Sequence, residues 1–444
     1  MEESIFKAYD VRGVYPEELD EEAAYKIGRA FVLFLRKPNP KIVLALDNRP
    51  SSALLFNELK RGILDQGGDV VEIGLTTTPV LYFVVGEYGY DGGIVITASH
   101  NPAQYNGLKF VRANAIPVSG ESGLNEIKEL VLKNDFYKPA KPGSVTDKDV
   151  LSDYVKSNRA LERFNFKVIV DTANSVSGVV VPEMFAGIKT IHIFNHLDGT
   201  FPNHEPDPSK PENLRDLEQT VIKNKANLGV AFDGDGDRII FIDEKGKPVP
   251  SDMILALMAS ILLRNKDNAH AKILYDVRCS NIVAETILSW GGTPVASRIG
   301  HSFIKAKMRQ DDILFGGEYS GHFYHRQGFY CESPYFVLFE VLKEMKRSGK
   351  PISELIKPFQ KYFQSGEINF RVDNPNEKIE KVREKYSDAF ASRIDGLKLG
   401  FSDWWLLVRA SNTEPLLRVI IEAKTKFLLQ EKITEVTQVI RSLS

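Results

Sequence analysis

Cysteine is scarce in this chain of 444 residues, which contains only two, Cys279 and Cys331. Two cysteines cannot build a disulfide scaffold, and they suit a protein that works in a reducing compartment. Long apolar runs are also missing: no window holds about 18 consecutive apolar residues, so we expect no membrane-spanning helix. Residues 1–4 are Met-Glu-Glu-Ser, and no basic segment followed by an apolar run indicates a signal peptide. These absences predict a cytoplasmic protein without a membrane partner.

An excess of charge of one sign is lacking as well. The 57 lysines and arginines nearly balance the 59 aspartates and glutamates, which leaves a formal net charge of −2. Such a balance provides no broad basic surface for a phosphate backbone, so nucleic acid is not expected as a partner. The oligomeric state stays open between a monomer and a small homo-oligomer, and the length alone suggests about three domains.

What the sequence does contain is a regular alternation of short β-branched runs with segments of helical period. This alternation is typical of βαβ units and of sheets whose strands are mostly parallel. The residues after 364 differ, because four strands with helices beside them form an α+β pattern. The predicted strands are 42–46, 70–73, 94–96, 167–171, 228–232, 239–242, 313–315, 368–372, 397–401, 405–408 and 417–421.

Turn-forming residues interrupt the alternation and divide the chain. Lys-Pro-Gly-Ser at 141–144 and Pro-Val-Pro at 248–250 predict the first two boundaries. The proline-rich stretch 195–213 is predicted to be a surface loop, because the strands after it complete the same unit. We therefore predict an α/β protein of three similar α/β domains with mixed sheets and one C-terminal α+β domain. The predicted domains are 1–146, 147–247, 248–364 and 365–444.

The first segment that suggests chemistry is residues 97–102, Thr-Ala-Ser-His-Asn-Pro, directly after the predicted strand 94–96. Ligands of open α/β sheets bind at strand ends, so Ser99 is a candidate nucleophile facing a cleft. A capping turn without chemistry is the plain alternative, since serine, asparagine and proline all form turns. A serine hydrolase is a competitor, but Thr97 and Asn101 stand where its nucleophile elbow has glycines. Lys109 could bring a cation to the same place.

The second segment is residues 233–238, Asp-Gly-Asp-Gly-Asp-Arg, after the predicted strand 228–232. Alternating glycines allow Asp233, Asp235 and Asp237 to fold around one hard cation, and Mg²⁺ is the favoured ion. The spacing also imitates a calcium loop with Glu244 in the twelfth position. That alternative is disfavoured because Arg238 stands where the turn needs glycine. A solvated acidic turn without metal remains the simplest competitor. Arg238 always carries charge and suits phosphate.

Two further loops complete the pattern, one in each remaining block. Glu318 and Ser320 follow the predicted strand 313–315, and in an extended loop they would point the same way and bind vicinal hydroxyls of a sugar. A flexible turn is the competing interpretation. Residues 409–415, Arg-Ala-Ser-Asn-Thr-Glu-Pro, together with Arg418, supply donors that capture a phosphate dianion, or else a β-turn with an exposed cap. The four loops together are more specific than any one of them.

The four loops resemble those of the α-D-phosphohexomutase family, which includes phosphoglucomutase, phosphomannomutase and phosphoglucosamine mutase. The likeness extends over the whole chain, and it includes residues 9–13 (Tyr-Asp-Val-Arg-Gly), 47–52 (Asp-Asn-Arg-Pro-Ser-Ser) and 78–79 (Thr-Pro). The resemblance implies four domains around a central cleft, each giving one loop.

The resemblance also implies a role for each candidate residue. Ser99 would carry the transferred phosphate and bind Mg²⁺ together with Asp233, Asp235 and Asp237. The implied sugar-binding residues are Glu318, Ser320 and His322, and the implied ligands of the phosphate that does not react are Arg409, Ser411, Asn412, Thr413 and Arg418. The implied cationic or proton-transferring residues are Arg12, Lys109, Arg238, Arg278 and His301, with Lys109 and His301 both open as the proton-transfer group.

The reaction implied by the resemblance converts hexose 6-phosphate and hexose 1-phosphate into each other. Phosphoserine gives its phosphoryl group to the substrate, and the resulting hexose 1,6-bisphosphate, which is also an activator, turns and returns its other phosphate. Residues 317–326 are more similar to the mannose group, so mannose and glucose phosphates are the expected substrates. Phosphoglucosamine mutase is the first alternative, because it shares a near-identical loop. A metal-dependent sugar phosphatase and a non-catalytic sugar-phosphate sensor are the others.

Overall fold

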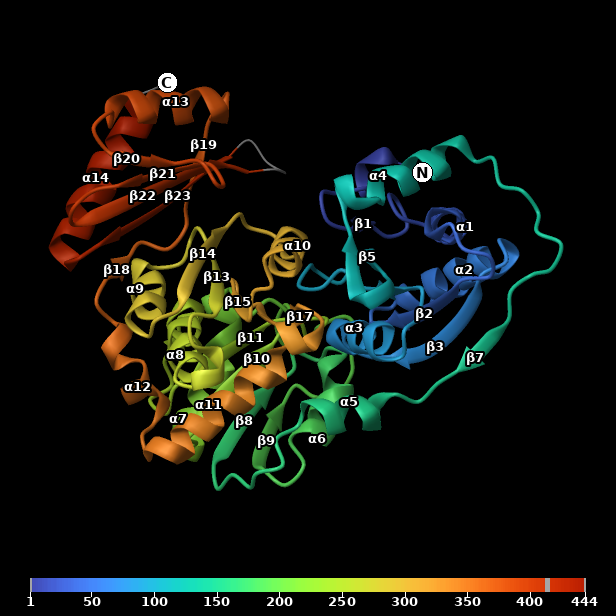
Figure 1. Ribbon diagram of the computed structural model, residues 1–444, viewed down its shortest axis with the longest axis horizontal. Helices are drawn as coiled ribbons and strands as arrows, with labels where there is room; N and C mark the ends of the chain where they lie inside the picture. The colour runs from blue at the N-terminus through green and yellow to red at the C-terminus, as the bar shows by residue number, and fades with distance from the viewer. Residues whose placement is uncertain (1, 412–415, 443–444) are drawn as a thin grey trace.

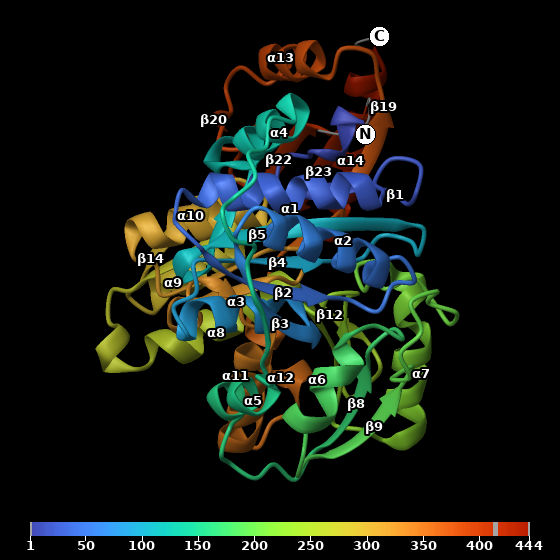
Figure 2. The same ribbon diagram turned by 90° about the vertical axis from the view of Figure 1, so that its right-hand side faces the viewer.

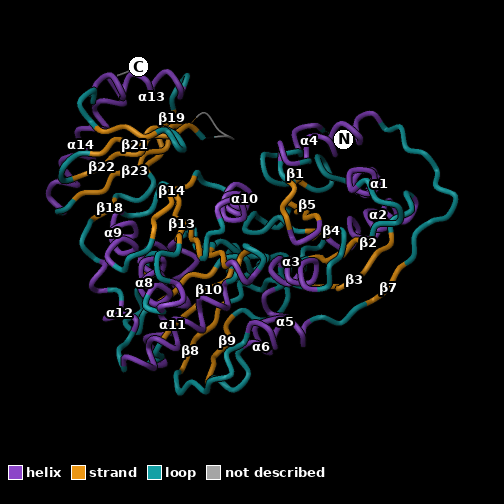
Figure 3. Tube along the Cα trace, in the orientation of Figure 1, coloured by secondary structure: helices purple, strands orange, loops and turns teal. Residues whose placement is uncertain are grey.

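The computed structural model describes residues 2–411 and 416–442, and Figure 1 shows four domains, each built on a sheet of its own. Two predicted site residues, Asn412 and Thr413, lie outside the described residues. The predicted class is confirmed: three α/β domains with mixed sheets precede a C-terminal domain with an antiparallel sheet. Figure 3 shows how helices and strands alternate along the trace of the first three domains.

The first domain has a seven-stranded sheet in the order β1-β5-β4-β2-β3-β7, with β6 beside β5. Side chains of a strand alternate between its two faces. Ile42 and Leu44 therefore join the core that contains α1, α2 and α4, whereas Val43 and Ala45 join the core that contains α3. The strands are β1 (Val11–Val14), β2 (Lys41–Leu46), β3 (Asp69–Leu75), β4 (Gly92–Ile96), β5 (Tyr105–Arg112), β6 (Ile116–Val118) and β7 (Val145–Asp147), and the helices are α1 (Glu21–Leu35), α2 (Ser52–Asp65), α3 (Thr78–Glu87) and α4 (Leu124–Lys133), with 3-10 turns at Glu3–Ile5, Ala113–Ala115 and Gly120–Ser122.

The segment after α4 runs along the outside of the first domain before it enters the second (Figures 1 and 2). On the way it forms β7, which pairs in parallel with β3. The predicted boundary at 146 falls inside this strand, which belongs to the sheet of the first domain. The three predicted domain boundaries remain predictions.

The second domain has a five-stranded sheet in the order β12-β11-β10-β8-β9. Strands β8, β9 and β10 are parallel, and β11 returns antiparallel to β10. The strands predicted at 167–171, 228–232 and 239–242 coincide with β8, β10 and β11. The elements are α5 (Leu151–Asn158), β8 (Lys167–Asp171), α6 (Ser177–Met184), β9 (Lys189–Ile193), a 3-10 turn (Pro211–Leu214), α7 (Arg215–Asn224), β10 (Leu228–Phe232), β11 (Ile239–Ile242) and β12 (Pro248–Val249).

The third domain repeats this arrangement with the order β14-β13-β15-β16-β17. Its first three strands are parallel, and β16 and β17 are antiparallel additions. The strand predicted at 313–315 begins two residues later, because buried Ile313 and Leu314 connect the preceding helix to the ladder. The elements are α8 (Ser251–Leu263), a 3-10 turn (Lys266–Asn268), β13 (Lys272–Asp276), α9 (Asn281–Ser289), β14 (Thr293–Ser297), α10 (His301–Asp311), β15 (Phe315–Gly317), β16 (Phe323–His325), a 3-10 turn (Arg326–Gly328), β17 (Cys331–Glu332), α11 (Pro334–Ser348), α12 (Ile352–Leu355) and a 3-10 turn (Lys357–Phe359).

The fourth domain has an antiparallel sheet in the order β18-β23-β22-β21-β20, with β19 also paired to β23. One face packs on α13 and α14 through residues such as Leu406 and Val408. The other face presents Trp405 and Leu407 to Val277 of the third domain, which attaches the two domains. The elements are β18 (Phe363–Gln364), β19 (Ile368–Arg371), α13 (Pro375–Lys385), β20 (Phe390–Ser392), β21 (Leu397–Gly400), β22 (Trp404–Ala410), β23 (Leu416–Ala423) and α14 (Lys426–Ser442).

Within residues 2–411 and 416–442, no helix has both the length and the hydropathy needed to cross a membrane.

Candidate active site

Ser99 lies in the loop after β4, with its side chain buried against the second domain. Its φ of 51° is left-handed, a region that costs a residue with a Cβ about 1–2 kcal/mol. Its N–H donates to Thr97 Oγ1 at 2.9 Å, and its Oγ donates to Asp233 Oδ2 at 2.9 Å. The loop therefore directs the hydroxyl at the acidic segment of the neighbouring domain.

His100 does not form a hydrolase dyad with Ser99. Its Nδ1 lies 3.4 Å from Ser99 Oγ, but the same nitrogen lies 2.9 Å from Arg238 Nη2, which can only donate. Burial, and after it the charge of Arg238, holds the pKa of His100 well below its ordinary value. The guanidinium thus occupies the lone pair that a general base would use, which argues against the serine-hydrolase alternative.

Asp233, Asp235 and Asp237 lie in the turn between β10 and β11, and all three are buried. One carboxylate oxygen from each lies within 4.8 Å of the others. The backbone N–H groups of Asp237 and Arg238 both donate to Asp233 Oδ1 at 3.1 Å, which folds the turn around its own carboxylate. Gly234 is required here, because a Cβ at this position would lie 2.1 Å from the carbonyl oxygen of Ser99.

Two side chains of the first domain reach this acidic cluster. Lys109 Nζ donates to Asp235 Oδ2 at 2.6 Å and to Asp237 Oδ2 at 2.7 Å, and Thr78 Oγ1 donates to Asp235 Oδ2 at 2.6 Å. The second oxygen of Asp235, Oδ1, is buried and accepts no hydrogen bond. A buried carboxylate oxygen without a donor, beside two further carboxylates, fits a hard divalent cation. The residues present are therefore suited to hold a metal ion.

The buried charged groups of the cluster strongly shift the pKa values of one another. Burial and the two neighbouring carboxylates raise the pKa of Asp233 well above its ordinary value. Burial alone would also raise the pKa of Asp237, but Lys109 and His322 outweigh it and lower that pKa. Burial alone would lower the pKa of Lys109, and the carboxylates of Asp235 and Asp237 reverse this and raise it. Lys109 is thus a fixed cation between two carboxylates.

The calcium-loop alternative is not found. The residues after the acidic turn form β11 (Ile239–Ile242), where the second half of a calcium loop would continue. Glu244, in the twelfth position, accepts hydrogen bonds from the backbone N–H, at 3.4 Å, and the hydroxyl of Ser353. Its carboxylate is therefore committed to α12 of the third domain.

Arg238 and His322 connect the second domain to the third. They pair as an isolated antiparallel bridge, and the N–H of Ile239 donates to the carbonyl oxygen of Gly321 at 3.1 Å. Arg238 Nε donates to His322 Nε2 at 3.2 Å, and the same nitrogen of His322 lies 3.2 Å from Asp237 Oδ1. The acidic turn and the loop after β15 therefore form one continuous structure.

The loop that carries Glu318 and Ser320 is a turn, so the prediction of an extended loop was wrong. The N–H of Gly321 donates to the carbonyl oxygen of Glu318 at 3.1 Å, and the φ of 91° at Gly321 closes the turn. The buried carboxylate of Glu318 accepts a hydrogen bond from the hydroxyl of Tyr324. Ser320 Oγ instead lies 2.9 Å from His322 Nδ1. Glu318 Oε1 also lies 3.6 Å from the same nitrogen, so the two polar side chains meet at His322.

Arg278 follows β13 and is held by Asp276. Its Nη2 and Nε donate to Asp276 Oδ2 and Oδ1 at 2.7 and 3.1 Å, and Nη2 also lies 3.5 Å from Glu318 Oε2. Burial alone would lower the pKa of Arg278, but the carboxylate of Asp276 outweighs it and raises that pKa. A fixed guanidinium therefore lies beside the candidate sugar-binding carboxylate.

His301 begins α10 and lies close to the buried pair of Lys305 and Glu332. Its Nδ1 is 3.9 Å from Glu332 Oε1, and the ring of Tyr9 from the first domain packs at 5.7 Å between centroids. Burial, and after it the charge of Lys305, holds the pKa of His301 well below its ordinary value. The imidazole is therefore neutral near pH 7, and its buried Nδ1 has no hydrogen-bond partner.

Arg409 and Arg418 are direct partners in the β22–β23 ladder of the fourth domain. Arg409 Nη2 lies 3.2 Å from Glu367 Oε2, Arg418 Nη1 lies 3.1 Å from Glu367 Oε1, and Arg418 Nη2 donates to Ser411 Oγ at 3.4 Å. One carboxylate thus orients two guanidiniums side by side, as an anion site requires. The predicted residues Asn412 and Thr413 lie outside the described residues.

The structure brings most of the predicted residues into one network and leaves others beside it. Arg12 lies beside it, where its Nη1 donates to Asn101 Oδ1 at 2.7 Å and its Nη2 donates to Asp10 Oδ2 at 2.5 Å. His301 lies beside it, packed on Tyr9, and the residues of the fourth domain form a second cluster around Glu367. The network connected by direct contacts contains Ser99, Lys109, Asp233, Asp235, Asp237, Arg238, Arg278, Glu318, Ser320 and His322.

Several residues that hold this site were not predicted as functional. Thr78, Asp276, Tyr324 and Glu367 were given no role. Thr78 and Glu367 act on residues that only the fold brings near, because their partners lie 157 positions away and 42 and 51 positions away. One sequence signal could have found Asp276: an aspartate two residues before an arginine occurs after β2, at Asp47-Asn48-Arg49, and after β13, at Asp276-Val277-Arg278.

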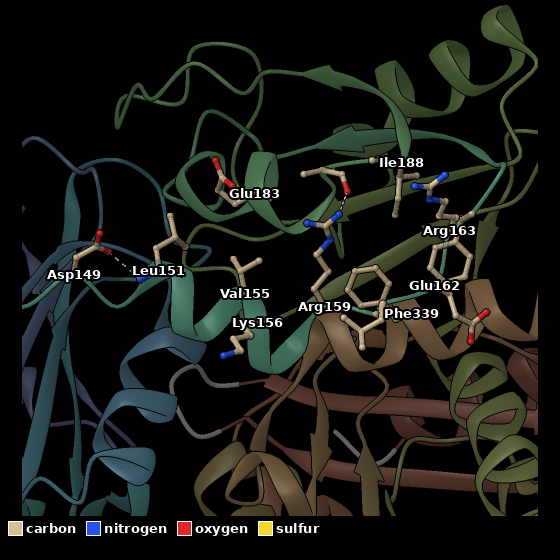
Figure 4. A pocket seen from close by; sticks show the side chains of 16 residues that line it. Asp149, Leu151, Val155, Lys156, Arg159, Glu162, Arg163, Glu183, Ile188 and Phe339 are labelled. Atoms are coloured by element: carbon tan, nitrogen blue, oxygen red, sulfur yellow. Dashed lines mark hydrogen bonds between the residues drawn. The ribbon is translucent and has the colours of Figure 1, made fainter.

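A cavity of about 960 Å³ lies away from this network, at the junction of α5, α6 and α11 (Figure 4). Arg159 crosses it and donates to the carbonyl oxygen of Ala186, and Glu183 and Phe339 lie on its walls. None of its lining residues is a candidate site residue. The cavity is therefore distinct from the predicted active site.

Models of four protein-family domains match the chain in order. They are described as Phosphoglucomutase/phosphomannomutase, alpha/beta/alpha domains I, II and III and the C-terminal domain. The matched residues are 3–138, 148–246, 250–362 and 367–438. All four loops described above lie inside matched regions.

Similar proteins have the same extent. The chain is 39% identical over 452 residues to a phosphomannomutase of Methanocaldococcus jannaschii, with 99% of this chain and 98% of that protein covered. It is 36% identical to a phosphomannomutase/phosphoglucomutase of Pseudomonas aeruginosa, with 95% and 92% covered. A phosphoglucomutase/phosphomannomutase family protein from Burkholderia thailandensis has a similar structure, with a TM-score of 0.91, 32% identity, and 100% and 98% of the chains covered.

A more distant solved structure shares the fold. The phosphoglucomutase parafusin from Paramecium, in an open form, has a TM-score of 0.79 at 16% identity, with 98% of this chain and 94% of that chain covered.

Proposed function

The chain belongs to the phosphoglucomutase/phosphomannomutase family, and from that premise we propose that it interconverts hexose 1-phosphates and hexose 6-phosphates through a phosphoserine at Ser99. It is an intramolecular phosphotransferase, which makes it an isomerase. The observation that carries the role of Ser99 is its hydrogen bond to Asp233 at 2.9 Å, which places a hydroxyl on the acidic cluster of another domain.

We propose Mg²⁺ as the ion of the acidic cluster, held by Asp233, Asp235 and Asp237 together with the phosphate on Ser99. The buried Oδ1 of Asp235 without a donor supports a cation there. When bound, the ion neutralises charge on the phosphoryl oxygens. Lys109 and Arg238 contribute fixed positive charge to the same place.

In the proposed reaction, the bond between Ser99 Oγ and phosphorus breaks while a hydroxyl oxygen of the hexose monophosphate bonds to that phosphorus. The proton of the hydroxyl passes to a base, and we propose His301 for this step, because its buried Nδ1 has no hydrogen-bond partner. The hexose 1,6-bisphosphate then reverses in the site and returns its other phosphoryl group to Ser99 Oγ, and the hexose oxygen that loses this group takes the proton back from the base. No water enters the balance, and no inorganic phosphate leaves.

Substrate recognition is proposed for two regions. Glu318, Ser320 and His322 contact sugar hydroxyls, with Arg278 beside Glu318. Arg409, Ser411 and Arg418 hold the phosphate that does not react, and Asn412 and Thr413, which lie outside the described residues, complete the same loop. Arg12 adds positive charge next to the serine loop, residues 97–104, because it donates a hydrogen bond to Asn101 of that loop.

We propose mannose and glucose phosphates as the substrates, because relatives at 36–39% identity are named phosphomannomutase or phosphomannomutase/phosphoglucomutase. Glucosamine phosphate is the alternative sugar. Hexose 1,6-bisphosphate is proposed as the activator, and a cytoplasmic monomer or small homo-oligomer as the working form.

The test is a substrate panel. The protein is incubated with Mg²⁺ and separately with the 1-phosphates of mannose, glucose and glucosamine, and phosphorus NMR follows the 6-phosphates. We expect rapid conversion of mannose and glucose 1-phosphates by the wild type, and a loss of at least several orders of magnitude in S99A. Full activity of S99A would refute the role of Ser99. Release of inorganic phosphate in excess of the isomer would favour a phosphatase instead.

A further inference from the structure

Arg49 lies directly behind the serine loop, in the turn between β2 and α2, and its side chain is 0% exposed. A guanidinium carries five N–H donors in a rigid fork. In Arg49 every one of them has an acceptor. The acceptors are Asp47 Oδ2 at 3.1 Å for Nε, the carbonyl oxygens of Pro102 and Tyr105 at 2.6 and 3.0 Å for Nη1, and those of Ser99 and Asn101 at 2.7 and 2.6 Å for Nη2.

We propose that Arg49 is a positioning residue for phosphoryl transfer. By holding the carbonyl oxygen of Ser99, it keeps this residue in its left-handed conformation and its Oγ directed at Asp233. Because all five donors are used within the protein, Arg49 has none left for a substrate phosphate, and it acts only through the serine loop. The inference rests on the proposed role of Ser99.

Arg49 and Asp47 together form a clamp on the serine loop, and Asp47 is itself held by hydrogen bonds. Asp47 Oδ1 accepts the backbone N–H of Arg49 at 3.0 Å and the hydroxyl of Ser52 at 2.5 Å. Asn106 Nδ2 donates to Ser51 Oγ and Ser52 Oγ at 2.8 and 3.0 Å, just beyond the last carbonyl that Arg49 holds. The N–H of Asp47 also donates to the carbonyl oxygen of Ile96 at 2.9 Å, so the turn before α2 is bonded to both ends of the serine loop. Such a scaffold restores one position of Ser99 each time its phosphate leaves and returns.

The clamp also contacts the domain that carries the acidic cluster. The ring of Phe201 in the second domain covers the guanidinium, with 5.0 Å from Arg49 Cζ to the ring centroid. Gly199 comes so close that a Cβ there would lie 2.1 Å from the carbonyl oxygen of Asn48. Arg49 thus contacts both the serine loop and the second domain, and it helps to fix the position of Ser99 relative to that domain.

Lysine cannot take over this role, because its ammonium has three donors and no planar fork. We expect R49K to shift the serine loop and to lower the rate of phosphoryl transfer about 100-fold, the effect of a misplacement near 1 Å. Substrate affinity should change little, since Arg49 does not touch the substrate. A residue needed only for folding would instead lower stability and leave the rate of the folded protein unchanged.

The experiment uses the full-length protein phosphorylated on its serine, with mass spectrometry to measure the phosphorylated fraction. Rapid quench then measures phosphoryl transfer to mannose 6-phosphate at saturating and subsaturating concentrations. R29K is the matched control: Arg29 lies on α1 in the same domain and donates to Gln66 and to the carbonyl oxygen of Tyr137, away from the loop. R49K should show the lowered rate at unchanged apparent affinity, whereas R29K should transfer like the wild type. A rate in R49K within about twofold of the wild type would overturn the inference.

D47N provides a second measurement if R49K does not fold. D47N keeps the guanidinium of Arg49 but removes the negative charge that holds its Nε. The rate of phosphoryl transfer should again fall, while the affinity for the substrate should stay unchanged. An unchanged rate in folded D47N overturns the inference as well. S99A separates the two proposals: activity in S99A contradicts the proposed function, whereas an inactive S99A with a fully active R49K contradicts only the role of Arg49.

Discussion

At the scale of single residues, the site consists of charged groups held by partners far away in the sequence. Asp235 shows this, because its donors Lys109 and Thr78 lie 126 and 157 positions away. Ser99 and the three aspartates could be predicted, since a strand end and an alternating spacing are local signals. Thr78 could not be assigned a role, because nothing in its own neighbourhood indicates that its hydroxyl reaches the acidic turn.

Thr78 provides a prediction about the metal. In T78V the shape of the side chain is kept, but the hydrogen bond of 2.6 Å to Asp235 Oδ2 is lost. Partners that orient a metal ligand typically change metal affinity 10–100-fold when removed. We expect the Mg²⁺ concentration for half-maximal activity to rise about 10–100-fold in a metal titration, with most of the activity regained at saturation. The matched control is T286V, at a buried threonine on α9. Equal metal titrations of T78V and wild type would contradict the assignment.

At the scale of elements, the three α/β domains share a turn at the end of one strand, in which an aspartate side chain caps the backbone. Asp47 after β2, Asp171 at the end of β8 and Asp276 at the end of β13 each accept the backbone N–H two residues later, at 3.0, 2.9 and 2.7 Å. In the first and third domains the same carboxylate also holds the arginine at that position, Arg49 or Arg278. The sequence has no exact repeat, but the spacing of aspartate and arginine at 47–49 and 276–278 indicates this common feature in two of the three domains.

Element positions were largely predictable where a strand is a continuous apolar run. Strands β8, β10 and β11 have the predicted bounds, because each contains a continuous run of buried apolar residues, which is typical of strands covered on both faces. The strand predicted at 313–315 was displaced, because Ile313 and Leu314 are equally buried while they only lead into β15. An apolar run therefore indicates which residues are buried, but it does not show which of them form hydrogen bonds in the sheet.

Helix α8 provides a prediction about pH. Burial raises the pKa of Asp252 from 3.8 to about 6, and its Oδ2 accepts the N–H of Ser280 at 3.0 Å. The folded state therefore binds this proton more tightly than the unfolded state, so its contribution to stability is lost as pH rises from about 4 to about 6. D252N removes that loss of stability and keeps an acceptor for the N–H of Ser280. The free energy of unfolding of D252N at pH 7 should exceed that of the wild type by at most about 3 kcal/mol, and this difference should vanish near pH 3.

Thermal unfolding of wild type and D252N between pH 4 and pH 8 measures this gain. D267N, at an exposed aspartate of the same domain, is the control and should follow the wild type. If the melting temperatures of D252N and wild type stay parallel across the whole range, Asp252 does not titrate near pH 6 and the explanation is wrong.

At the scale of the whole molecule, three domains meet through direct hydrogen bonds at the site, and the fourth attaches to the third through Trp405 and Leu407. The number of domains could be predicted from four strand-end loops and a change of pattern. Their contacts could not, because Ser99 with Asp233 and Arg238 with His322 pair surfaces that only the assembled chain brings together. The strand β7 was also missed, since three exposed residues carry no hydrophobic pattern.

The fourth domain provides a prediction about substrate binding. Arg409 is held beside Arg418 by Glu367, and in the proposed function both bind the phosphate that does not react. A hydrogen bond to a charged group is worth about 1.5–3 kcal/mol, so R409Q should lower kcat/KM about 10–100-fold. R371Q is the control, because Arg371 is exposed on β19 of the same domain. Steady-state kinetics in which R409Q and R371Q behave alike would remove Arg409 from the site.

The central claim is that Ser99 carries the phosphoryl group between the two ends of the sugar. Its most direct test is to incubate the dephosphorylated protein with Mg²⁺ and glucose 1,6-bisphosphate labelled with radioactive phosphorus, and then to map the labelled peptide. We predict stoichiometric label on the peptide that contains Ser99, which unlabelled glucose 6-phosphate removes as bisphosphate. Label on another residue, or label that leaves only as inorganic phosphate, would contradict the account.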